Sequence, residues 1–558
     1  MPNTIRDIRK TILGDENNLL FENNVSVPLK EPSSVIRCNV YRPKGDGKYP
    51  GLIAYGPYGK DIYYGDFHPK SFSEVNPAHK SKYSAWETPD PVFRTRQGYV
   101  VIRADEQGLG YSPGVLDTMS PGTADCFFQL IQWAADQPWR SGKLGLLGVS
   151  YYAGQWHVAA RAPKGLACII PHEGMLDYYR DRCRHGGILS NNFISFWWNR
   201  QDEDTIEGDL SENELHQQVQ DQNADNAENQ FLGDDNYASK VFQFQLEDID
   251  VPILSVANWG GISLHLRGKC RGLHLGWIAI QVPPVKLQMS FLDVFLKGND
   301  HAGWTTGHIP RVSICLRKGD VGFNNPAGEK TFPRRDENEW PLARTVYTRY
   351  YLTPSLGLTQ KLTTFAASQL GYQARGSDGR SSILQFKTPP CVRDMEITGH
   401  PVAHLAISVE SAQSPPPSNL DLDIFVTLRH FSAVGKEVHN TGSSGDSVPV
   451  TKGWLRVSLC KVNHDSSYHR DYLPRREYRS SDVLPYKCDV GLWPTNVVVE
   501  AGRRLVFEVA SVDTEGAGLF KHNSPVDWPP SKFEGTNYIR FGEGRGNYIV
   551  LPIIPGDS

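Results

Sequence analysis

The chain has no Cys-x-x-Cys pair, although it contains nine cysteines. Because these cysteines are scattered and odd in number, the sequence predicts neither a structural zinc site nor a disulfide framework. The first residues, MPNTIRDIRKTILGDENN, include no apolar core of the secretory type. No uncharged run reaches membrane-spanning length either. We therefore expect a reducing, cytoplasmic location and no membrane partner.

A marked excess of charge of either sign is also missing, since the net charge is -4 over 558 residues. This balance gives no indication of a nucleic-acid partner. Hydrophobic residues make up 39% and charged residues 22% of the chain, as is ordinary for a globular protein. The length exceeds what a single core supports, so we expect about two to four domains.

The stretch KLGLLGVSYYAG, from Lys143 to Gly154, is the most informative part of the sequence. Leu144 to Leu147 predicts a short buried strand, and QWHVAARAP predicts a helix that ends at Pro163. A serine between a strand and a helix, with glycine two residues before it, matches the nucleophile elbow of α/β-hydrolases. Ser150 is then the nucleophile.

The elbow pattern has one departure, because Tyr152 stands where the general pattern has a second glycine. A side chain at Gly148 is expected to collide with the adjoining element in so tight a turn. The backbone amide of Tyr151 can point at a developing oxyanion. The alternative is that Gly-x-Ser occurs here by chance, which the flanking strand and helix make the minority interpretation.

Strand-like and helical segments alternate around the elbow. Apolar runs from Leu52 to Tyr55, Tyr99 to Ala104 and Leu166 to Ile170 predict buried strands, and Thr123 to Asp136 has helical spacing. Such alternation favours a parallel sheet that is covered on both faces. From Thr345 onward, short strand-like segments punctuated by Pro, Gly and Ser predict a β-sandwich.

Several segments resemble the cocaine-esterase and X-prolyl dipeptidyl-peptidase family of α/β-hydrolases. They are PGLIAYGPYGK, ADEQGLGYSPG, QWAADQPWRSGKLGLLGVSYYAG, LQMSFLDVFLKGND, KTPPCVRDMEITGHPVAHLAISVES and TKGWLRVSL. The resemblance implies an α/β class of fold, with an α/β-hydrolase domain, a helical cap insertion and a C-terminal jelly-roll sandwich. It places the hydrolase domain at 1–175 and 248–345, the cap at 176–247 and the jelly roll at 346–558.

The resemblance also implies roles for three residues. Ser150 attacks an ester or amide carbonyl, Tyr58 supplies a phenol donor to the oxyanion, and Tyr151 supplies its backbone amide. The alternative for Tyr58 is a packed loop aromatic, although its place in the Gly-Pro-Tyr-Gly loop favours the functional role. No metal or organic cofactor is implied.

The catalytic acid does not stand where the family has it. The family places an aspartate two residues after the tryptophan that follows the strand VPILSVAN, and Gly261 occupies that position here. A variation of the fold moves the acid to the end of the preceding central strand, where this chain has Glu173. We expect Glu173 to be the acid, which would fix and stabilise a histidine base. The alternative is a glutamate at a helix N-terminus, stabilised by the helix dipole.

The general base is not evident either. The family carries its histidine in a loop after the last sheet strand, here assigned to WIAIQV, and that loop holds none. His265 and His274 precede the strand, and His301 and His308 follow the closing helix. The base is lost, has moved, or is missing from a shortened sequence. His265 is the first candidate, because it follows the strand end that normally carries the acid. Gln107 is a further departure, since the family usually has arginine there.

The predicted cap contains two contrasting stretches. Phe193, Phe196, Trp197 and Trp198 could form a pocket wall or pack in a core. Between Arg200 and Lys240 there is no Lys or Arg, while Asp and Glu are frequent. That acidic run favours a solvated helix face or loop over a filter against anionic substrates.

Together these observations predict a serine esterase or amidase that acts on a small molecule by acyl transfer through Ser150. The alternative is a member of the fold that is catalytically impaired or non-hydrolytic: a pseudo-enzyme, a binding protein, or a catalyst of elimination or cyclisation. The absence of the loop histidine favours the alternative, whereas the elbow and Tyr58 favour the hydrolase. The sequence leaves open a homo-oligomer and the identity of the substrate.

Overall fold

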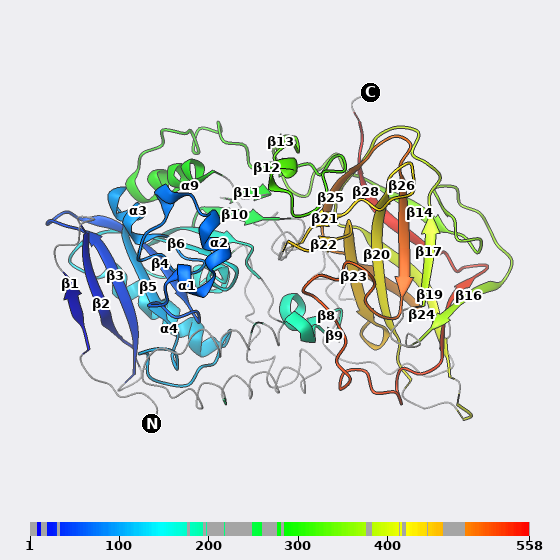
Figure 1. Cartoon of the computed structure of the whole chain (residues 1–558), viewed down its shortest axis with the longest axis horizontal. Helices are drawn as coiled ribbons and strands as arrows, with labels where there is room; N and C mark the ends of the chain where they lie inside the picture. The colour runs from blue at the N-terminus through cyan, green and yellow to red at the C-terminus, as the bar shows by residue number, and fades with distance from the viewer. Residues whose placement is uncertain are drawn as a thin grey trace.

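The structure is a computed structural model that describes residues 8–12, 19–30, 34–175, 179–193, 197, 217, 248–258, 276–280, 284–374, 382–411, 413–415, 420–442, 445–460 and 486–556. Gly261, His265, His274 and most of the predicted cap lie outside these residues. Two lobes lie side by side, with the first half of the chain in one and the second half in the other (Figure 1). In the described part of the chain, no helix is both long and apolar enough to cross a membrane.

An 11-stranded sheet forms the core of the first lobe. Its central strands run parallel, and antiparallel pairs lie at both edges. In spatial order the strands are β1 (Lys10–Ile12), β2 (Leu19–Pro28), β3 (Val35–Pro43), β5 (Val100–Asp105), β4 (Tyr49–Gly56), β6 (Arg140–Val149), β7 (Leu166–His172), β10 (Ile253–Ala257), β11 (Gly276–Ile280), β12 (Val312–Cys315) and β13 (Arg334–Glu337).

Both faces of this sheet are covered by helices, as the near-continuous apolar runs of its strands predict. On one face, α4 (Pro121–Ala135) and α5 (Trp156–Ala159) pack against strand residues such as Ile53 and Leu146. On the other face, α9 (Val285–Leu292) and the π-helix η7 (Asp293–Lys297) pack against residues such as Leu52 and Ile170. Figure 1 shows α4 and α9 on opposite sides of the sheet.

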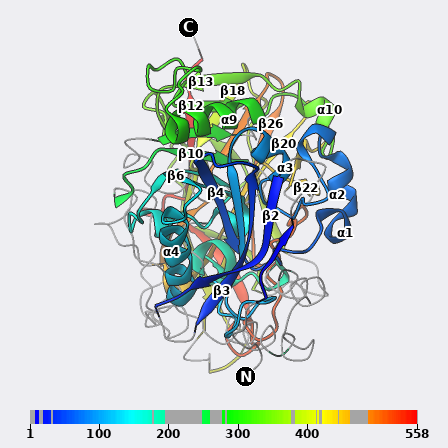
Figure 2. The same cartoon turned by 90° about the vertical axis from the view of Figure 1, so that its left-hand side faces the viewer.

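Shorter helical segments lie between β4 and β5. They are α1 (Tyr64–Phe67), α2 (Pro69–Glu74), the 3-10 helix η1 (Pro77–His79) and α3 (Pro91–Arg96). Figure 2 shows α1 and α2 together at one side of the sheet. Asp90 caps the first turn of α3, because its carboxylate accepts a hydrogen bond from the Phe93 amide.

Two expectations about this lobe need correction. The helix predicted from the elbow to Pro163 is replaced by a 3-10 turn, η2 (Ser150–Ala153), and the single turn of α5. Ala162 takes a left-handed φ of 47°, which is incompatible with a helix continuing to Pro163. The strand within WIAIQV, β11, is not the last strand, since β12 and β13 extend the sheet beyond it. The sequence of β13, RRDE, carries no apolar signal that predicts a strand.

The second lobe consists of two antiparallel sheets around a large apolar core, which confirms the predicted β-sandwich. The larger, 9-stranded sheet contains β14 (Val346–Leu352), β15 (Leu358–Thr359), β16 (Ser368–Gln373), β18 (Met395–Gly399), β19 (Val402–Glu410), β24 (Tyr486–Gly491), β25 (Thr495–Val499), β27 (Thr536–Phe541) and β28 (Tyr548–Ile554). The smaller, 4-stranded sheet contains β17 (Ile383–Lys387), β20 (Asp423–Phe431), β23 (Thr451–Arg456) and β26 (Arg504–Ala510).

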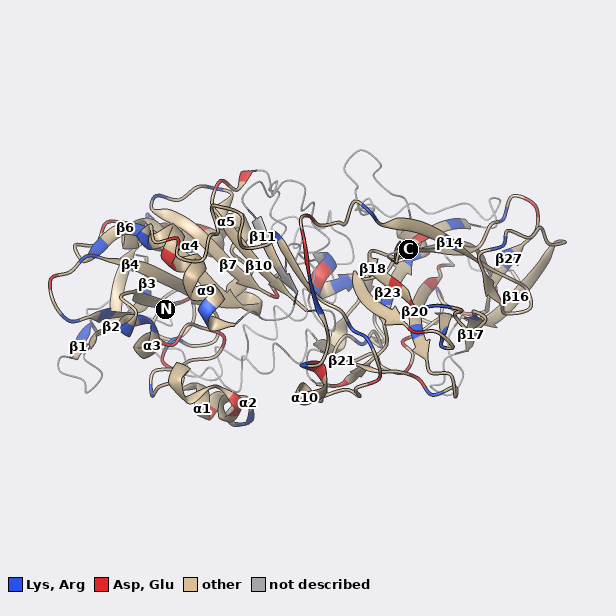
Figure 3. Cartoon of the chain, turned by 90° about the horizontal axis from the view of Figure 1, so that it is seen from above, with Lys and Arg blue, Asp and Glu red and all other residues tan. Residues whose placement is uncertain are grey.

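Small elements complete the structure: the pairs β8 (Arg184–His185) with β9 (Ile188–Leu189) and β21 (Asn440–Thr441) with β22 (Ser447–Val448), the helix α10 (Pro326–Glu329), the π-helix η3 (Tyr179–Cys183) and the 3-10 helix η9 (Val457–Leu459). Acidic and basic residues are interspersed over the described parts of both lobes (Figure 3).

Candidate active site

Ser150 lies at the carboxyl end of β6, where the chain turns into η2. Its φ of 57° falls in the left-handed region, which non-glycine residues seldom adopt outside functional turns. A Cβ at Gly148 would lie 2.3 Å from Tyr152 Cβ and 2.8 Å from the Tyr152 carbonyl oxygen. The sharp turn therefore requires glycine at this position, because any side chain would collide with Tyr152.

The unusual Tyr152 of the elbow fits because a second glycine makes room for it. A Cβ at Gly56, at the end of β4, would lie 2.8 Å from the Tyr152 ring. The Tyr152 side chain is buried and contacts the ring of Tyr58 at a centroid distance of 5.4 Å. The space that a glycine after the serine normally leaves is thus occupied by an aromatic ring.

Tyr58, in the loop after β4, is buried and faces the serine. Its hydroxyl accepts a hydrogen bond of 3.0 Å from Trp197 Nε1 and interacts with the side chain of Ser150. Burial, together with Glu87 nearby, raises the pKa of the Tyr58 phenol above its ordinary value, against the opposing effect of Arg182. The phenol therefore keeps its proton at neutral pH and can donate a hydrogen bond.

Tyr151 is the second residue of the 3-10 turn η2 and has a structural role through its side chain. The hydroxyl accepts a hydrogen bond of 3.1 Å from the Met119 amide, and the ring stacks on Trp197 at 5.7 Å with an interplanar angle of 7°. Amides in the first turn of a helix have no partner within that helix. The backbone amide of Tyr151 is therefore placed in the first turn of η2, and its role as an oxyanion donor stays a prediction.

Glu173 follows β7 directly, one strand away from the elbow. Val149 and His172 are partners in the parallel β6–β7 register, so Ser150 and Glu173 each come immediately after a paired residue. Glu173 also has a left-handed φ, of 50°. Gly174 and Met175, the next two residues, are not helical, which argues against a glutamate at a helix N-terminus. The proposed acid therefore lies at the same edge of the sheet as the proposed nucleophile.

The carboxyl group of Glu173 is buried beside the end of β10. Asn258 Nδ2 donates a hydrogen bond of 2.6 Å to Glu173 Oε1. Burial raises the pKa of this carboxyl to about 7, and the hydrogen bond from Asn258 opposes the rise. A group with this pKa changes its protonation state near neutral pH, which suits a catalytic carboxylate.

The histidine base is not found among the described residues. The polar neighbours of the Ser150 hydroxyl there are Arg182 and Tyr58, with no imidazole within hydrogen-bond distance. His301 and His308 are exposed. His265 lies outside the described residues, so its role as base stays a prediction. Gln107 bonds to Ser34 Oγ through Nε2, at 2.7 Å, rather than to the serine.

Arg182 is the site residue that the sequence analysis missed. It lies in η3, its side chain is 2% exposed, and Nη2 donates a hydrogen bond of 3.2 Å to Ser150 Oγ. Its guanidinium also lies 4.7 Å from the centre of the Phe193 ring, within the range of a cation–π interaction. Arginine does not accept a proton, so Arg182 cannot act as the base for Ser150.

Aromatic side chains surround these polar groups in one apolar cluster. Trp197 and Phe193, both predicted as wall candidates, belong to it, whereas Phe196 and Trp198 are outside the described residues. The second lobe contributes Phe520, whose ring lies 5.1 Å from that of Phe193. The wall of the site is therefore built from both lobes.

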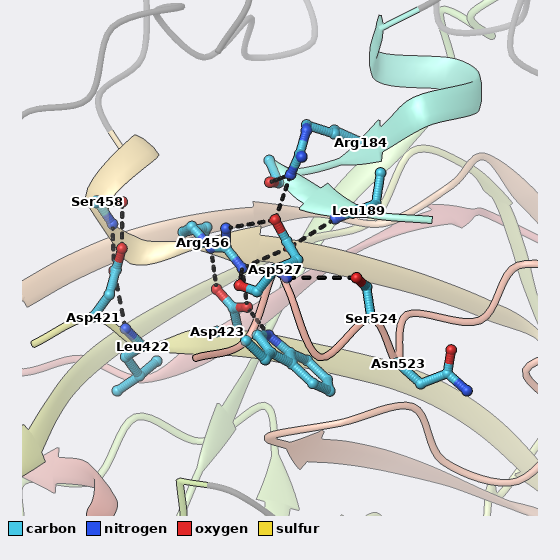
Figure 4. A network of polar contacts seen from close by, with 12 residues as sticks. Arg184, Leu189, Asp421, Leu422, Asp423, Arg456, Ser458, Asn523, Ser524 and Asp527 are labelled. Atoms are coloured by element: carbon cyan, nitrogen blue, oxygen red, sulfur yellow. Dashed lines mark hydrogen bonds and ion pairs between the residues drawn. The ribbon is translucent and has the colours of Figure 1, made fainter. Parts of the chain in front are cut away.

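The segment that carries Arg182 is attached firmly to the second lobe. Two residues later, Arg184 Nη1 lies 2.6 Å from Asp527 Oδ1, and the Leu189 amide donates to Asp527 Oδ2 at 3.0 Å. Asp527 also pairs with Arg456, which forms a two-bond ion pair with Asp423. Figure 4 shows Asp527 at the centre of this buried network. The position of Arg182 thus depends on contacts between the lobes.

Sequence comparisons agree with the geometry. The model of a family described as X-Pro dipeptidyl-peptidase (S15 family) matches residues 34–265. A second family model, which describes the X-Pro dipeptidyl-peptidase C-terminal non-catalytic domain, matches residues 304–550. The chain belongs to the cocaine-esterase and X-Pro dipeptidyl-peptidase-like family. This confirms the resemblance noted in the sequence, and the members of this family are serine hydrolases.

Relatives of known name align over almost the whole chain. Cocaine esterase from Rhodococcus sp. (strain MB1 Bresler) is 25% identical, with 97% of this chain and 99% of that protein covered. A CocE/NonD family hydrolase from Staphylococcus aureus has the same fold, with a TM-score of 0.77, 24% identity and coverage of 96% and 94%. An α-amino acid ester hydrolase has a TM-score of 0.65 at 16% identity, with coverage of 98% and 99%. These relatives show the fold class, and the family to which they point is one of serine hydrolases.

Proposed function

We propose that this family member hydrolyses an ester or amide by acyl transfer through Ser150 to water. The observation that carries the proposal is the strained Ser150 backbone, at φ 57°, at the end of a parallel strand and beside a buried phenol. This arrangement projects the hydroxyl from the sheet edge toward a hydrogen-bond donor. Ser150 is half-buried rather than fully buried, as a nucleophile that meets a substrate must be.

The oxyanion would be held by Tyr58 and by the Tyr151 amide. Because Trp197 Nε1 already donates to the Tyr58 oxygen, the phenol proton is free to point elsewhere. A preorganised donor of this kind stabilises charge that develops on the carbonyl oxygen in the transition state. Glu173 would supply the carboxylate of the relay, and His265 is proposed as the base that it supports.

The direct experiment is a rapid-mixing assay with 4-nitrophenyl acetate. If an acyl-enzyme forms on Ser150, nitrophenol should appear in a burst that approaches one equivalent per enzyme before the steady state. Neither burst nor steady-state release above the uncatalysed rate would count against acyl transfer.

Replacing Tyr58 with phenylalanine should lower kcat by about 100-fold to 1,000-fold, because it removes one oxyanion donor. The effect should fall on kcat more than on KM, since the donor acts on the transition state. Tyr350→Phe is a matched control, because the Tyr350 hydroxyl accepts a hydrogen bond from Gln360 in the second lobe. Equal kcat values for Tyr58→Phe and the wild type would show that Tyr58 only packs.

Glu173→Gln should lower turnover steeply and flatten the pH profile of kcat/KM near pH 7. With the pKa at about 7, the carboxyl becomes an anion only as the pH rises through that value, so wild-type activity should rise there. The folded state also holds this proton more tightly than the unfolded chain. The stability contributed by this group therefore declines between about pH 4.5 and pH 7, and the glutamine variant should lack that decline.

A second buried carboxyl, beside Tyr151, provides the discriminating comparison for this pH profile. Glu106 is also buried, and burial raises its pKa to about 8. If the rise in activity persists in Glu173→Gln and disappears in Glu106→Gln, the titrating group is Glu106 and the role of Glu173 is refuted.

A second candidate function is favoured by one observation: among the described residues, Ser150 contacts an arginine and a tyrosine but no histidine. Without a base the hydroxyl stays protonated and is a weak nucleophile. The Tyr58 phenol and the Tyr151 amide could then hold a bound ligand. They could also stabilise the oxyanion in an elimination or a cyclisation that needs no nucleophile. The absence of a burst in the acetate assay would favour this alternative.

A further inference from the structure

Arg182 presents a buried positive charge that forms no ion pair with any of the described residues. Its side chain is 2% exposed, and no carboxylate of the described residues lies within ion-pair distance of it. Its fully buried Nε has no acceptor among the described residues, and Nη2 meets only the neutral hydroxyl of Ser150. A buried ion normally has a partner of opposite charge, because desolvation without one is costly.

Nearby arginines of the same interface are paired. Arg184 is fully buried and contacts Asp527, and Arg456 contacts both Asp423 and Asp527. Asp527 forms ion pairs with Arg184 and Arg456, so its charge does not balance that of Arg182. Glu87 acts on the Tyr58 phenol through space, and no ion pair between Glu87 and Arg182 is found in the described part of the chain. Among the described residues, the lack of an ion-paired carboxylate at Arg182 is therefore a local feature of the site and not of the whole interface.

We propose that Arg182 binds a carboxylate of the substrate, so that the enzyme prefers esters or amides that carry an anionic group close to the scissile carbonyl. This inference rests on the proposed acyl transfer through Ser150. The guanidinium has a planar set of N–H donors that matches a carboxylate, and Nε is available for it. The Phe193 ring beneath the guanidinium holds it in place.

The geometry limits where the anionic group can be. Arg182 Nη2 lies 3.2 Å from Ser150 Oγ, and a charged N–H···O bond is about 2.8 Å long, so the carboxylate oxygen lies within about 6 Å of the attacking oxygen. With single bonds of about 1.5 Å, this span corresponds to about two to four bonds from the carbonyl carbon. Half-esters of short dicarboxylic acids and acyl esters of short hydroxy acids both meet this limit.

The reaction itself would follow ordinary acyl transfer. The Ser150 oxygen forms a bond to the carbonyl carbon, the bond to the alkoxy or amino group breaks, and the hydroxyl proton leaves with that group. Water then breaks the Ser150 ester and returns the proton. A substrate carboxylate would also accept hydrogen bonds from the Arg182 guanidinium. It would compete with the lone pair of Ser150 Oγ for the Nη2 donor. Substrate binding would thus relieve the hydrogen bond that makes the serine oxygen less nucleophilic.

The test compares anionic esters with neutral ones of similar shape. Monoethyl succinate is paired with ethyl levulinate for an acyl-side carboxylate, and acetoxyacetate with its methyl ester for a leaving-group carboxylate. At least one anionic member should have a kcat/KM about 30-fold or more above that of its neutral partner. Arg182→Met should bring that ratio close to one, mainly by raising KM for the anion, and Arg182→Lys should keep part of it. Arg393→Met, at an exposed position, should leave the ratio unchanged.

Stability separates a binding role from a structural one. Since Arg182→Met removes an uncompensated buried charge and retains an apolar chain over Phe193, its melting temperature should equal or exceed that of the wild type. Equal turnover of the anionic and neutral members by the wild type, or a preference that persists in Arg182→Met, would overturn the inference while the proposed hydrolysis stands.

A binding measurement keeps the inference testable if nothing is hydrolysed. Calorimetry with Ser150→Ala should show binding of monoethyl succinate or acetoxyacetate that is stronger than binding of the neutral partner and is lost when Arg182→Met is added. Binding that does not distinguish anion from neutral ester would refute the role of Arg182. A wild type that binds the anion but shows no turnover would refute the proposed hydrolysis alone.

Discussion

Ser150→Ala is expected to abolish both the burst and the steady-state hydrolysis of 4-nitrophenyl acetate, with a loss of at least about 1,000-fold. The variant removes only the hydroxyl oxygen, so the fold should be retained. Alanine must adopt the same left-handed φ of 57° as serine, and neither residue favours that conformation. Melting temperature and circular dichroism should therefore change little while turnover is lost.

Ser73→Ala is a suitable control for this experiment, because Ser73 is exposed on α2 and its hydroxyl donates only to the Lys70 carbonyl oxygen. Its activity should match that of the wild type. Retention of turnover per folded molecule in Ser150→Ala would show that another residue, or bound water, performs the attack.

The largest effect on stability is expected from Asp527→Ala. Asp527 is buried between Arg184 and Arg456, and its removal takes away a carboxylate that pairs with both arginines. Breaking a buried pair from one side typically costs about 3–5 kcal/mol. Urea denaturation should show a loss of this size in the free energy of unfolding, with Asp336→Ala, at an exposed position of β13, as the control.

The acid sensitivity of the protein should change in the same variant. Arg456 and Arg184 hold the pKa of Asp527 below its ordinary value, despite burial. A depressed folded-state pKa stabilises the protein above the ordinary carboxyl pKa, and this stabilisation is lost as the pH falls below about 4. Asp527→Ala should lack this part of the acid-induced loss. An unfolding free energy equal to that of the wild type at neutral pH would show that the network does not hold the lobes together.

The sequence predicted those parts of the fold that depend on local apolar patterns. The central strands, such as Leu166–His172, are buried on both faces and therefore appear as continuous apolar runs. The edge strand β13, with the sequence RRDE, has no such run, because it needs only one sheet neighbour. The helix after the elbow was predicted too long, since the backbone of Ala162 is decided by the turn into Pro163 rather than by helical periodicity.

The same distinction applies to the site. Ser150 and Tyr58 were found because a tight turn and a Gly/Pro-rich loop leave a recognisable pattern near each of them. Glu173 was found from its place after a strand, which the parallel register puts next to the elbow. Arg182 gave no signal, because its contact with Ser150 depends on a π-helical turn and on the attachment of the following segment to the second lobe. Contacts across such distances in the chain are not encoded in any local spacing.

The most direct test of the nucleophile is labelling of the purified protein with a fluorophosphonate, followed by peptide mapping with mass spectrometry. A serine activated for acyl transfer attacks the phosphorus and retains the phosphonyl group. We expect one adduct per chain, on the peptide that contains Ser150, and none in Ser150→Ala. An unlabelled wild-type protein that binds substrate, or an adduct on a different residue, would contradict the assignment of Ser150 as the nucleophile.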